Sequence, residues 1–128
     1  MKRLLAAGSV CAALFLGVLG CGGESMAGYQ KIPAAEAKSM IDKGGVTVVD
    51  VRHEDEYKAG HIPGAILVPN ETIGNEPPEL LSDKNAVILV YCRSGVRSRQ
   101  ASEKLVKLGY KKVFDIGGIK DWPYDVAK

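Results

Sequence analysis

Short apolar runs alternate with amphipathic segments from residue 29 to the end of the chain. Four runs of β-branched and other apolar side chains are typical of buried parallel strands: residues 46–51, 65–68, 86–91 and 112–116. Apolar spacing and Pro/Gly boundaries predict helical segments between them: residues 34–41, 54–58 and 98–108, with single turns at 79–81 and 118–122. This alternation favours an α/β fold in which helices cover both faces of a parallel sheet.

The first 28 residues differ in composition from the rest of the chain. Lys2 and Arg3 form a basic start, and residues 4–20 are uncharged and mostly apolar. That run is a little short for a membrane span, which needs about 20 apolar residues, and is typical of an export signal. We therefore expect a signal peptide at residues 1–20, a flexible tether at 21–28 and one domain at 29–128.

The end of the apolar run, Val18-Leu19-Gly20-Cys21, resembles the lipobox of bacterial lipoproteins. The resemblance implies that Cys21 carries a lipid and becomes the mature N-terminus. The protein would then be exported to the periplasm or cell envelope and would touch a membrane only through this anchor. Two alternatives stay open: an uncleaved signal anchor, and a plain signal peptide cut near Ala27.

Composition excludes one class of function. The 128 residues are enough for one domain with a core, and 46% hydrophobic with 25% charged residues is an ordinary globular composition. Lys2 and Arg3 account for the whole formal net charge of +2, so the expected domain lacks the basic surplus of a nucleic-acid-binding protein. We therefore expect no nucleic-acid partner.

The cysteines point to a single reactive thiol. If Cys11 is removed with the signal peptide and Cys21 is acylated, Cys92 is the only free thiol of the mature protein. A disulfide framework and a site of several thiolates are then both impossible. No cluster of His and Cys indicates a metal ion or a cofactor, and we expect neither.

The segment around Cys92 carries the candidate chemistry. A strand leads into Cys92, and a helix follows a loop that we predict to bind an anion: Arg93, Ser94, Gly95, Val96 and Arg97. Loops at the carboxyl ends of parallel strands open where α/β sheets bind ligands, and the N–H groups and dipole of the following helix point at the loop. The glycine permits a tight curl and the arginines add positive charge, so each feature favours the thiolate. The alternative is a Cys that merely packs as a small apolar residue.

Four segments of the chain resemble the rhodanese domain, in order and at family-like spacing over residues 29–122: Asp50-Val51-Arg52, Glu56-Tyr57-Lys58-Ala59-Gly60-His61-Ile62-Pro63-Gly64-Ala65, Tyr91-Cys92-Arg93-Ser94-Gly95-Val96-Arg97-Ser98 and Gly117-Gly118-Ile119-Lys120-Asp121-Trp122. The resemblance implies a three-layer α/β fold around a five-stranded, mostly parallel sheet. It implies that Cys92 forms a persulfide, taking sulfur from a small sulfur anion such as thiosulfate and passing it to a thiol or to cyanide. It implies no cofactor.

Two other functions use a cysteine in a loop of this kind. A cysteine phosphatase has five residues between its Cys and Arg, whereas four lie between Cys92 and Arg97, and Ser98 stands where the phosphatase arginine would be. The shorter loop fits one sulfur atom better than a tetrahedral phosphate. A carrier that delivers persulfide sulfur to a partner protein without turnover would have the same sequence.

The remaining residues of the matching segments are interpreted as support for the loop. Asp50 ends its strand and is expected to anchor the loop by hydrogen bonds to Arg97 or to backbone groups. Arg52 and Glu56 are four residues apart and are expected to pair. The resemblance implies a structural role for His61, as a hydrogen-bonded turn histidine.

Overall fold

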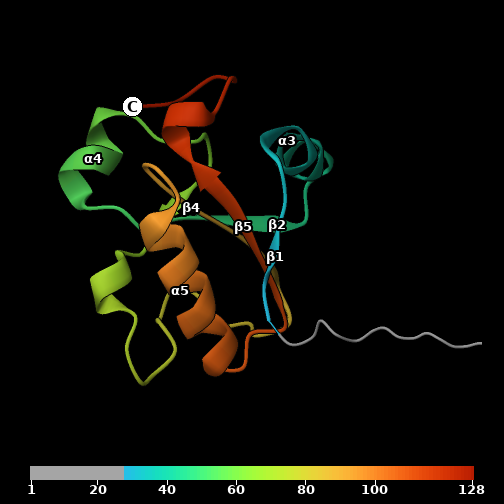
Figure 1. The fold of residues 1–128 in the computed structure, drawn as a ribbon, viewed down its shortest axis with the longest axis vertical. Helices are drawn as coiled ribbons and strands as arrows, with labels where there is room; N and C mark the ends of the chain where they lie inside the picture. Colours follow the sequence, from blue (N-terminus) through green and yellow to red (C-terminus); the bar gives the residue numbers. More distant parts are fainter. Residues whose placement is uncertain (1–27) are drawn as a thin grey trace, which may run out of the picture.

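A five-stranded parallel sheet forms the middle layer of the domain (Figure 1). The computed structural model describes residues 28–128, so the expected signal peptide, Cys21 and all but the last residue of the tether lie outside the described residues. The strands lie in the order β1-β5-β4-β2-β3, and every neighbouring pair is parallel. Their bounds are β1 Gln30–Lys31, β2 Val46–Asp50, β3 Ile66–Leu67, β4 Val87–Cys92 and β5 Lys112–Gly118.

Within residues 28–128 the strands alternate with three helices and one 3-10 turn: α3 Ala34–Lys43, α4 Glu54–Ala59, the turn Asn70–Thr72 and α5 Val96–Lys107. A second 3-10 turn, Ile119–Asp121, follows β5. Helix α5 packs on one face of the sheet, and helices α3 and α4 contribute to the core on the other face. The three-layer α/β fold is therefore confirmed. No helix within residues 28–128 is long and apolar enough to cross a membrane.

Side-chain alternation along the strands creates two separate cores. Val49 and Val90 face α5 and pack with Leu105, whereas their neighbours Val48 and Leu89 face α3 and pack with Ala37. All six side chains are at most 5% exposed. Successive residues of a strand point to opposite faces, so strands buried on both faces need the continuous apolar runs that the sequence has.

The structure corrects several predicted boundaries. Helix α5 begins at Val96 rather than at residue 98. The single turn predicted at residues 79–81 is confirmed, and the bond from Leu81 N–H to Pro78 O (3.0 Å) closes it. The 3-10 turn Asn70–Thr72 and strand β1 were not predicted. Strand β1 consists of two exposed polar residues, so no apolar pattern in the sequence marks it. Its strand conformation comes from backbone pairing with β5.

Candidate active site

Cys92 is the last residue of β4, the central strand of the sheet. The register of β4 against β5 shifts between Val90 and Tyr91, which brings Cys92 opposite Gly118 at the end of β5. The cysteine is a free thiol and only 1% exposed, while Arg93 and Ser94 after it are exposed. The sulfur therefore lies at the carboxyl edge of the sheet, beneath a loop that meets solvent.

Gly95 shapes the loop after Cys92. Its φ of +106° lies in the left-handed region, which glycine adopts without strain. In this conformation the Gly95 N–H donates to Cys92 Sγ at 3.0 Å, and its carbonyl accepts the bond from Arg99 N–H (3.2 Å) that begins helix α5. One glycine thus supplies a hydrogen bond to the sulfur and directs the N-terminus of a helix toward it.

A buried carboxylate holds this loop against β5. Asp115 is 1% exposed, and its Oδ1 accepts hydrogen bonds from Ser98 Oγ (2.8 Å) and from Gly117 N–H (2.9 Å). Ser98 Oγ also lies 3.1 Å from the Gly95 carbonyl. These bonds connect the first turn of α5 to the bulge in β5 and so fix where the loop begins and ends. Asp115 was not predicted from the sequence, because no local pattern marks its partner Ser98, which lies 17 residues earlier.

Arg97, in the first turn of α5, is held by Glu56 of α4. Its Nη1 and Nη2 donate to Glu56 Oε1 and Oε2 at 2.8 and 3.0 Å. The hydrogen bonds from Arg97 lower the pKa of Glu56 from 4.5 to about 2 and outweigh the effect of its partial burial. They also raise the pKa of Arg97. The helix dipole disfavours a positive charge such as Arg97 at the N-terminus of α5, and the Glu56 carboxylate compensates for that unfavourable interaction.

We predict that Glu56→Gln lowers the free energy of unfolding by about 1 kcal/mol at neutral pH, since a partly buried bidentate ion pair is lost. A depressed pKa stabilises the fold above the unfolded value of 4.5, and this contribution is lost as pH falls toward about 2. Urea titrations between pH 7 and pH 3 should show the difference between wild type and variant shrinking. The control Glu103→Gln removes an exposed carboxylate and should give a small difference at every pH; a Glu56→Gln difference that grows on acidification would contradict the assignment.

Asp50 forms a buried network that differs from the one expected. Its carboxylate accepts bonds from Arg52 (Nη2 2.6 Å, Nε 2.9 Å, backbone N–H 2.9 Å) and from the Tyr91 hydroxyl (2.9 Å). Of the two expected partners of Asp50, Arg97 is wrong, because Arg97 donates to Glu56. A backbone partner is found, but it is the Arg52 N–H and not a group of the cysteine loop. The expected pairing of Arg52 with Glu56 is also wrong. Residues four apart face each other only within a helix, and Arg52 precedes the start of α4 at residue 54.

The same network holds the turn after α4. Arg52 Nη2 donates to the carbonyl of Gly60 (2.7 Å), and the N–H of Ile62 donates to the Tyr91 hydroxyl (3.0 Å). Between them, His61 Nδ1 lies 2.9 Å from the carbonyl of Tyr57, and the two rings stack 3.9 Å apart with an angle of 4°. The carbonyl can only accept, so Nδ1 carries the proton. His61 is therefore a hydrogen-bonded turn histidine, as predicted.

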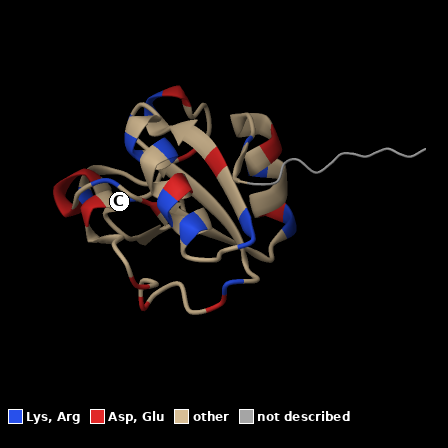
Figure 2. Ribbon diagram, turned by 60° about the horizontal axis from the view of Figure 1, so that its bottom comes forward, with Lys and Arg blue, Asp and Glu red and all other residues tan. Residues whose placement is uncertain are grey.

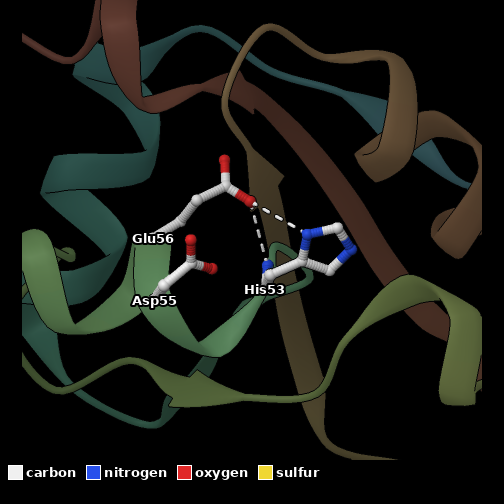
Figure 3. Close-up of side chains that lie close together, drawn as sticks. All are labelled: His53, Asp55 and Glu56. Carbon is white, nitrogen blue, oxygen red and sulfur yellow. Dashed lines mark hydrogen bonds and ion pairs between the residues drawn. The ribbon is translucent and has the colours of Figure 1, made fainter.

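Three side chains at the start of α4 could offer ligand atoms to a cation, His53, Asp55 and Glu56, whose nearest atoms lie within 4.8 Å of one another (Figure 3). The Glu56 carboxylate already accepts from Arg97 and from the His53 N–H (3.1 Å). His53 Nε2 lies 2.8 Å from Glu71 Oε2. His53 and Glu56 therefore already have partners, so we assign the cluster to the beginning of the helix rather than to a metal.

An open cleft of about 390 Å³ lies beside the cysteine loop. Arg93 of the loop, the turn residues Ile119 and Lys120, residues of α4 and Val126 line it. Acidic and basic residues are interspersed over the rest of the ribbon rather than gathered on one face (Figure 2). The cleft thus opens beside the loop, next to Arg93.

The fold and this loop define a class of protein. It is a small α/β domain with one free cysteine in residues 28–128, held at the carboxyl end of a central parallel strand and facing a helix N-terminus. The loop arrangement suits a nucleophile that attacks anions and holds a negatively charged product.

Comparison with known proteins gives the family. Residues 33–124 match the model of the rhodanese-like domain, and the chain belongs to that family. A thiosulfate sulfurtransferase GlpE from Coxiella burnetii is 32% identical over 95 residues, which cover 73% of this chain and 87% of the relative. A tRNA uridine(34) hydroxylase from Yersinia enterocolitica is 35% identical over 96 residues, but this chain spans only 27% of its length.

Solved structures agree with the fold. A rhodanese-related protein from Thermoplasma volcanium superimposes with a TM-score of 0.67 at 31% identity and covers 77% of this chain and 98% of its own. A rhodanese with anions from E. coli gives a TM-score of 0.57 at 34% identity, and the match covers 64% of this chain and 96% of the E. coli chain. The predicted fold class is therefore confirmed.

Proposed function

We propose that the protein is a sulfurtransferase that moves a sulfane sulfur from a small sulfur anion, such as thiosulfate, to a thiophilic acceptor through a persulfide on Cys92. The observation that carries this proposal is the Gly95 N–H, which donates to Cys92 Sγ at the N-terminus of α5. Membership of the rhodanese-like family and the similarity to thiosulfate sulfurtransferases support it.

The first displacement occurs at the outer sulfur of the donor. The Cys92 thiolate attacks that sulfur and forms a new S–S bond. The S–S bond of thiosulfate breaks, and sulfite leaves with the electron pair. The terminal persulfide sulfur carries the negative charge, which the N–H groups at the start of α5, with Arg93, Ser94, Val96 and Arg97 around them, would stabilise in the manner of an oxyanion hole.

The second displacement returns the enzyme to its starting state. An acceptor, cyanide or a thiolate, attacks the outer persulfide sulfur and forms a bond to it. The bond between that sulfur and Cys92 breaks, and the electron pair returns to Sγ as thiolate. Because the thiolate is regenerated directly, no general base, metal or cofactor enters the cycle, and the two half-reactions predict ping-pong kinetics.

The test is thiocyanate formation from thiosulfate and cyanide. Double-reciprocal plots at several cyanide concentrations should be parallel, as for a covalent relay. Loading of one sulfur without turnover would instead favour a carrier that delivers sulfur to a partner protein. Aryl phosphate should not be hydrolysed: Ser98, at the position of the phosphatase arginine, is uncharged and bonded to Asp115.

We predict that Gly118→Ala damages the site from the neighbouring strand. A Cβ at Gly118 would overlap the carbonyl group of Arg93 and lie 2.7 Å from the Cα of Ser94, and backbone atoms cannot yield as a flexible side chain can. Overpacking of this kind costs about 1–3 kcal/mol. We expect the rate of sulfur transfer to fall by roughly tenfold or more, because the cysteine loop is displaced from its position beside β5.

The matched control is Gly74→Ala. A Cβ there meets no atom within 4 Å, and its φ is not in the left-handed region. Thiocyanate formation and urea unfolding of the two variants should be compared. Equal activity in Gly118→Ala and Gly74→Ala would contradict the proposed contact between β5 and the cysteine loop.

We also propose that the protein is exported to the cell envelope and anchored by a lipid on Cys21. The basic start, the uncharged apolar run and the segment Val18-Leu19-Gly20-Cys21 support this proposal. Expressed in a bacterial host, the full chain should partition with membranes. The wild type should incorporate labelled palmitate and Cys21→Ser should not; equal labelling of the two would contradict a lipid on Cys21.

A further inference from the structure

The cleft beside the cysteine loop has room for more than a cyanide ion. Its volume of about 390 Å³ lies within the range of about 300–1,000 Å³ in which proteins bind small organic ligands. One of its lining residues, Val126, lies beyond residues 33–124, the segment that matches the family. This wall of the cleft is thus a feature of this chain that the family match does not describe.

Backbone pairing holds Val126 in place. The neighbouring residue, Ala127, donates its N–H to the His61 carbonyl (2.7 Å) and accepts from the His61 N–H (2.9 Å). Val126 Cγ2 comes within 3.9 Å of the position that a Cβ on Gly60 would occupy, although the side chain is 48% exposed. Together with Ala59 and Ile119, it gives the cleft an apolar wall.

The charges that line the cleft leave a positive balance. Arg52 is paired with Asp50, and the charge of Glu56 is offset by Arg97. Arg93 and Lys120 are both exposed, and neither has an acidic partner among residues 28–128. Two uncompensated cations next to an apolar wall are complementary to an organic anion.

We propose that this cleft binds the sulfur acceptor, and that the acceptor is a small organic thiol with a negatively charged group. Lys120 and Arg93 attract that group, and Val126 and Ile119 contact its carbon chain. The inference rests on the proposed function, because it assigns the acceptor of the second displacement. The thiolate bonds to the outer sulfur of the Cys92 persulfide, the bond from that sulfur to Cys92 breaks, and an organic persulfide anion leaves.

The acceptor half-reaction can be measured alone. The full chain is loaded with thiosulfate, freed of donor and mixed with one acceptor, and loss of the sulfur is timed by intact mass. The acceptors are 3-mercaptopropionate, neutral 2-mercaptoethanol and cationic cysteamine. Comparing each variant with wild type for the same thiol removes differences in intrinsic nucleophilicity.

Reversing one charge should reverse the preference. For Lys120→Glu we expect the rate constant with 3-mercaptopropionate, relative to 2-mercaptoethanol, to fall by about fivefold, and the relative rate with cysteamine to rise by a similar factor. The control Lys111→Glu makes the same change in net charge at the opposite end of β5, away from the cleft. It should leave both ratios near those of wild type.

The apolar wall has its own test. Val126→Ser should lower the rate with 6-mercaptohexanoate by about threefold more than the rate with 3-mercaptopropionate, because the longer chain contacts more of the wall. Leu80→Ser, which changes a 65% exposed leucine outside the cleft, should not separate the two thiols.

The outcomes distinguish the two proposals. If cyanide removes the sulfur from a loaded enzyme but Lys120→Glu and Lys111→Glu give the same ratios, the acceptor inference is overturned and the sulfurtransferase proposal stands. If thiosulfate loads no sulfur onto Cys92, the proposed function fails and the inference falls with it.

Discussion

Cys92→Ser should abolish thiosulfate-dependent thiocyanate formation, with a fall of roughly a thousandfold or more. The hydroxyl can still accept the Gly95 N–H that now reaches Sγ, so the loop keeps its hydrogen bond. What is lost is the nucleophile, because a serine hydroxyl is hardly ionised near neutral pH and no histidine lies within the loop to activate it. We expect the free energy of unfolding, measured with urea, to change by about 1 kcal/mol at most.

A control separates loss of the nucleophile from a general effect of substitution in the core. Ser102 is buried in α5, and its hydroxyl has no hydrogen-bond partner within the part of the chain that the structure describes. Ser102→Ala should retain activity and stability, since the removed hydroxyl was unsatisfied. Turnover by Cys92→Ser close to that of Ser102→Ala would remove Cys92 from the mechanism.

Asp50→Ala should give the largest loss of stability, about 3–5 kcal/mol. Asp50 is fully buried and accepts hydrogen bonds from both Arg52 and Tyr91. Its removal leaves the Arg52 guanidinium, whose side chain is 6% exposed, without its counter-charge. Arg52 and Tyr91 also hydrogen-bond to Gly60 and Ile62, so this turn should become less ordered as well.

Urea denaturation measures this loss, and two further variants define it. A domain of this size is stable by only about 5–15 kcal/mol, so Asp50→Asn, which keeps the shape and some of the hydrogen bonds, provides an intermediate case. Asp42→Asn removes one partner of the exposed Lys38–Asp42 pair and should cost well under 1 kcal/mol. A loss for Asp50→Ala as small as that for Asp42→Asn would contradict a buried ion pair.

The sequence predicted the elements whose signals are local. Each of these signals is contained in a short stretch of sequence: the apolar runs of β2, β4 and β5, and the glycine that precedes α5. The position of the cysteine loop could therefore be predicted from the sequence alone. Strand β1 could not be predicted, because its two exposed residues are ordered by pairing with β5. Helix α5 starts earlier than predicted because the left-handed Gly95 lets Val96 and Arg97 join it.

The ion pairs of the site were not predictable from the spacing of residues in the sequence. Glu56 and Arg97 are 41 residues apart in the sequence, and only the folded chain brings the start of α4 within reach of the start of α5. Asp50 and Arg52 are two apart, and they pair because the chain is extended there and its side chains alternate. Spacing suggested a different partner for Arg52, since a helix rule was applied to a residue outside a helix. The expected partner of Arg97 was Asp50, because Asp50 lies at the end of its strand, and no local pattern marks Glu56 instead.

The central claim is that Cys92 carries the transferred sulfur, and intact mass tests it most directly. We predict that the purified chain gains the mass of about one sulfur atom after thiosulfate, that cyanide removes this mass, and that Cys92→Ser shows no gain at that site. A folded protein with a free Cys92 thiol that gains no mass from thiosulfate, and releases no thiocyanate, would contradict the persulfide mechanism.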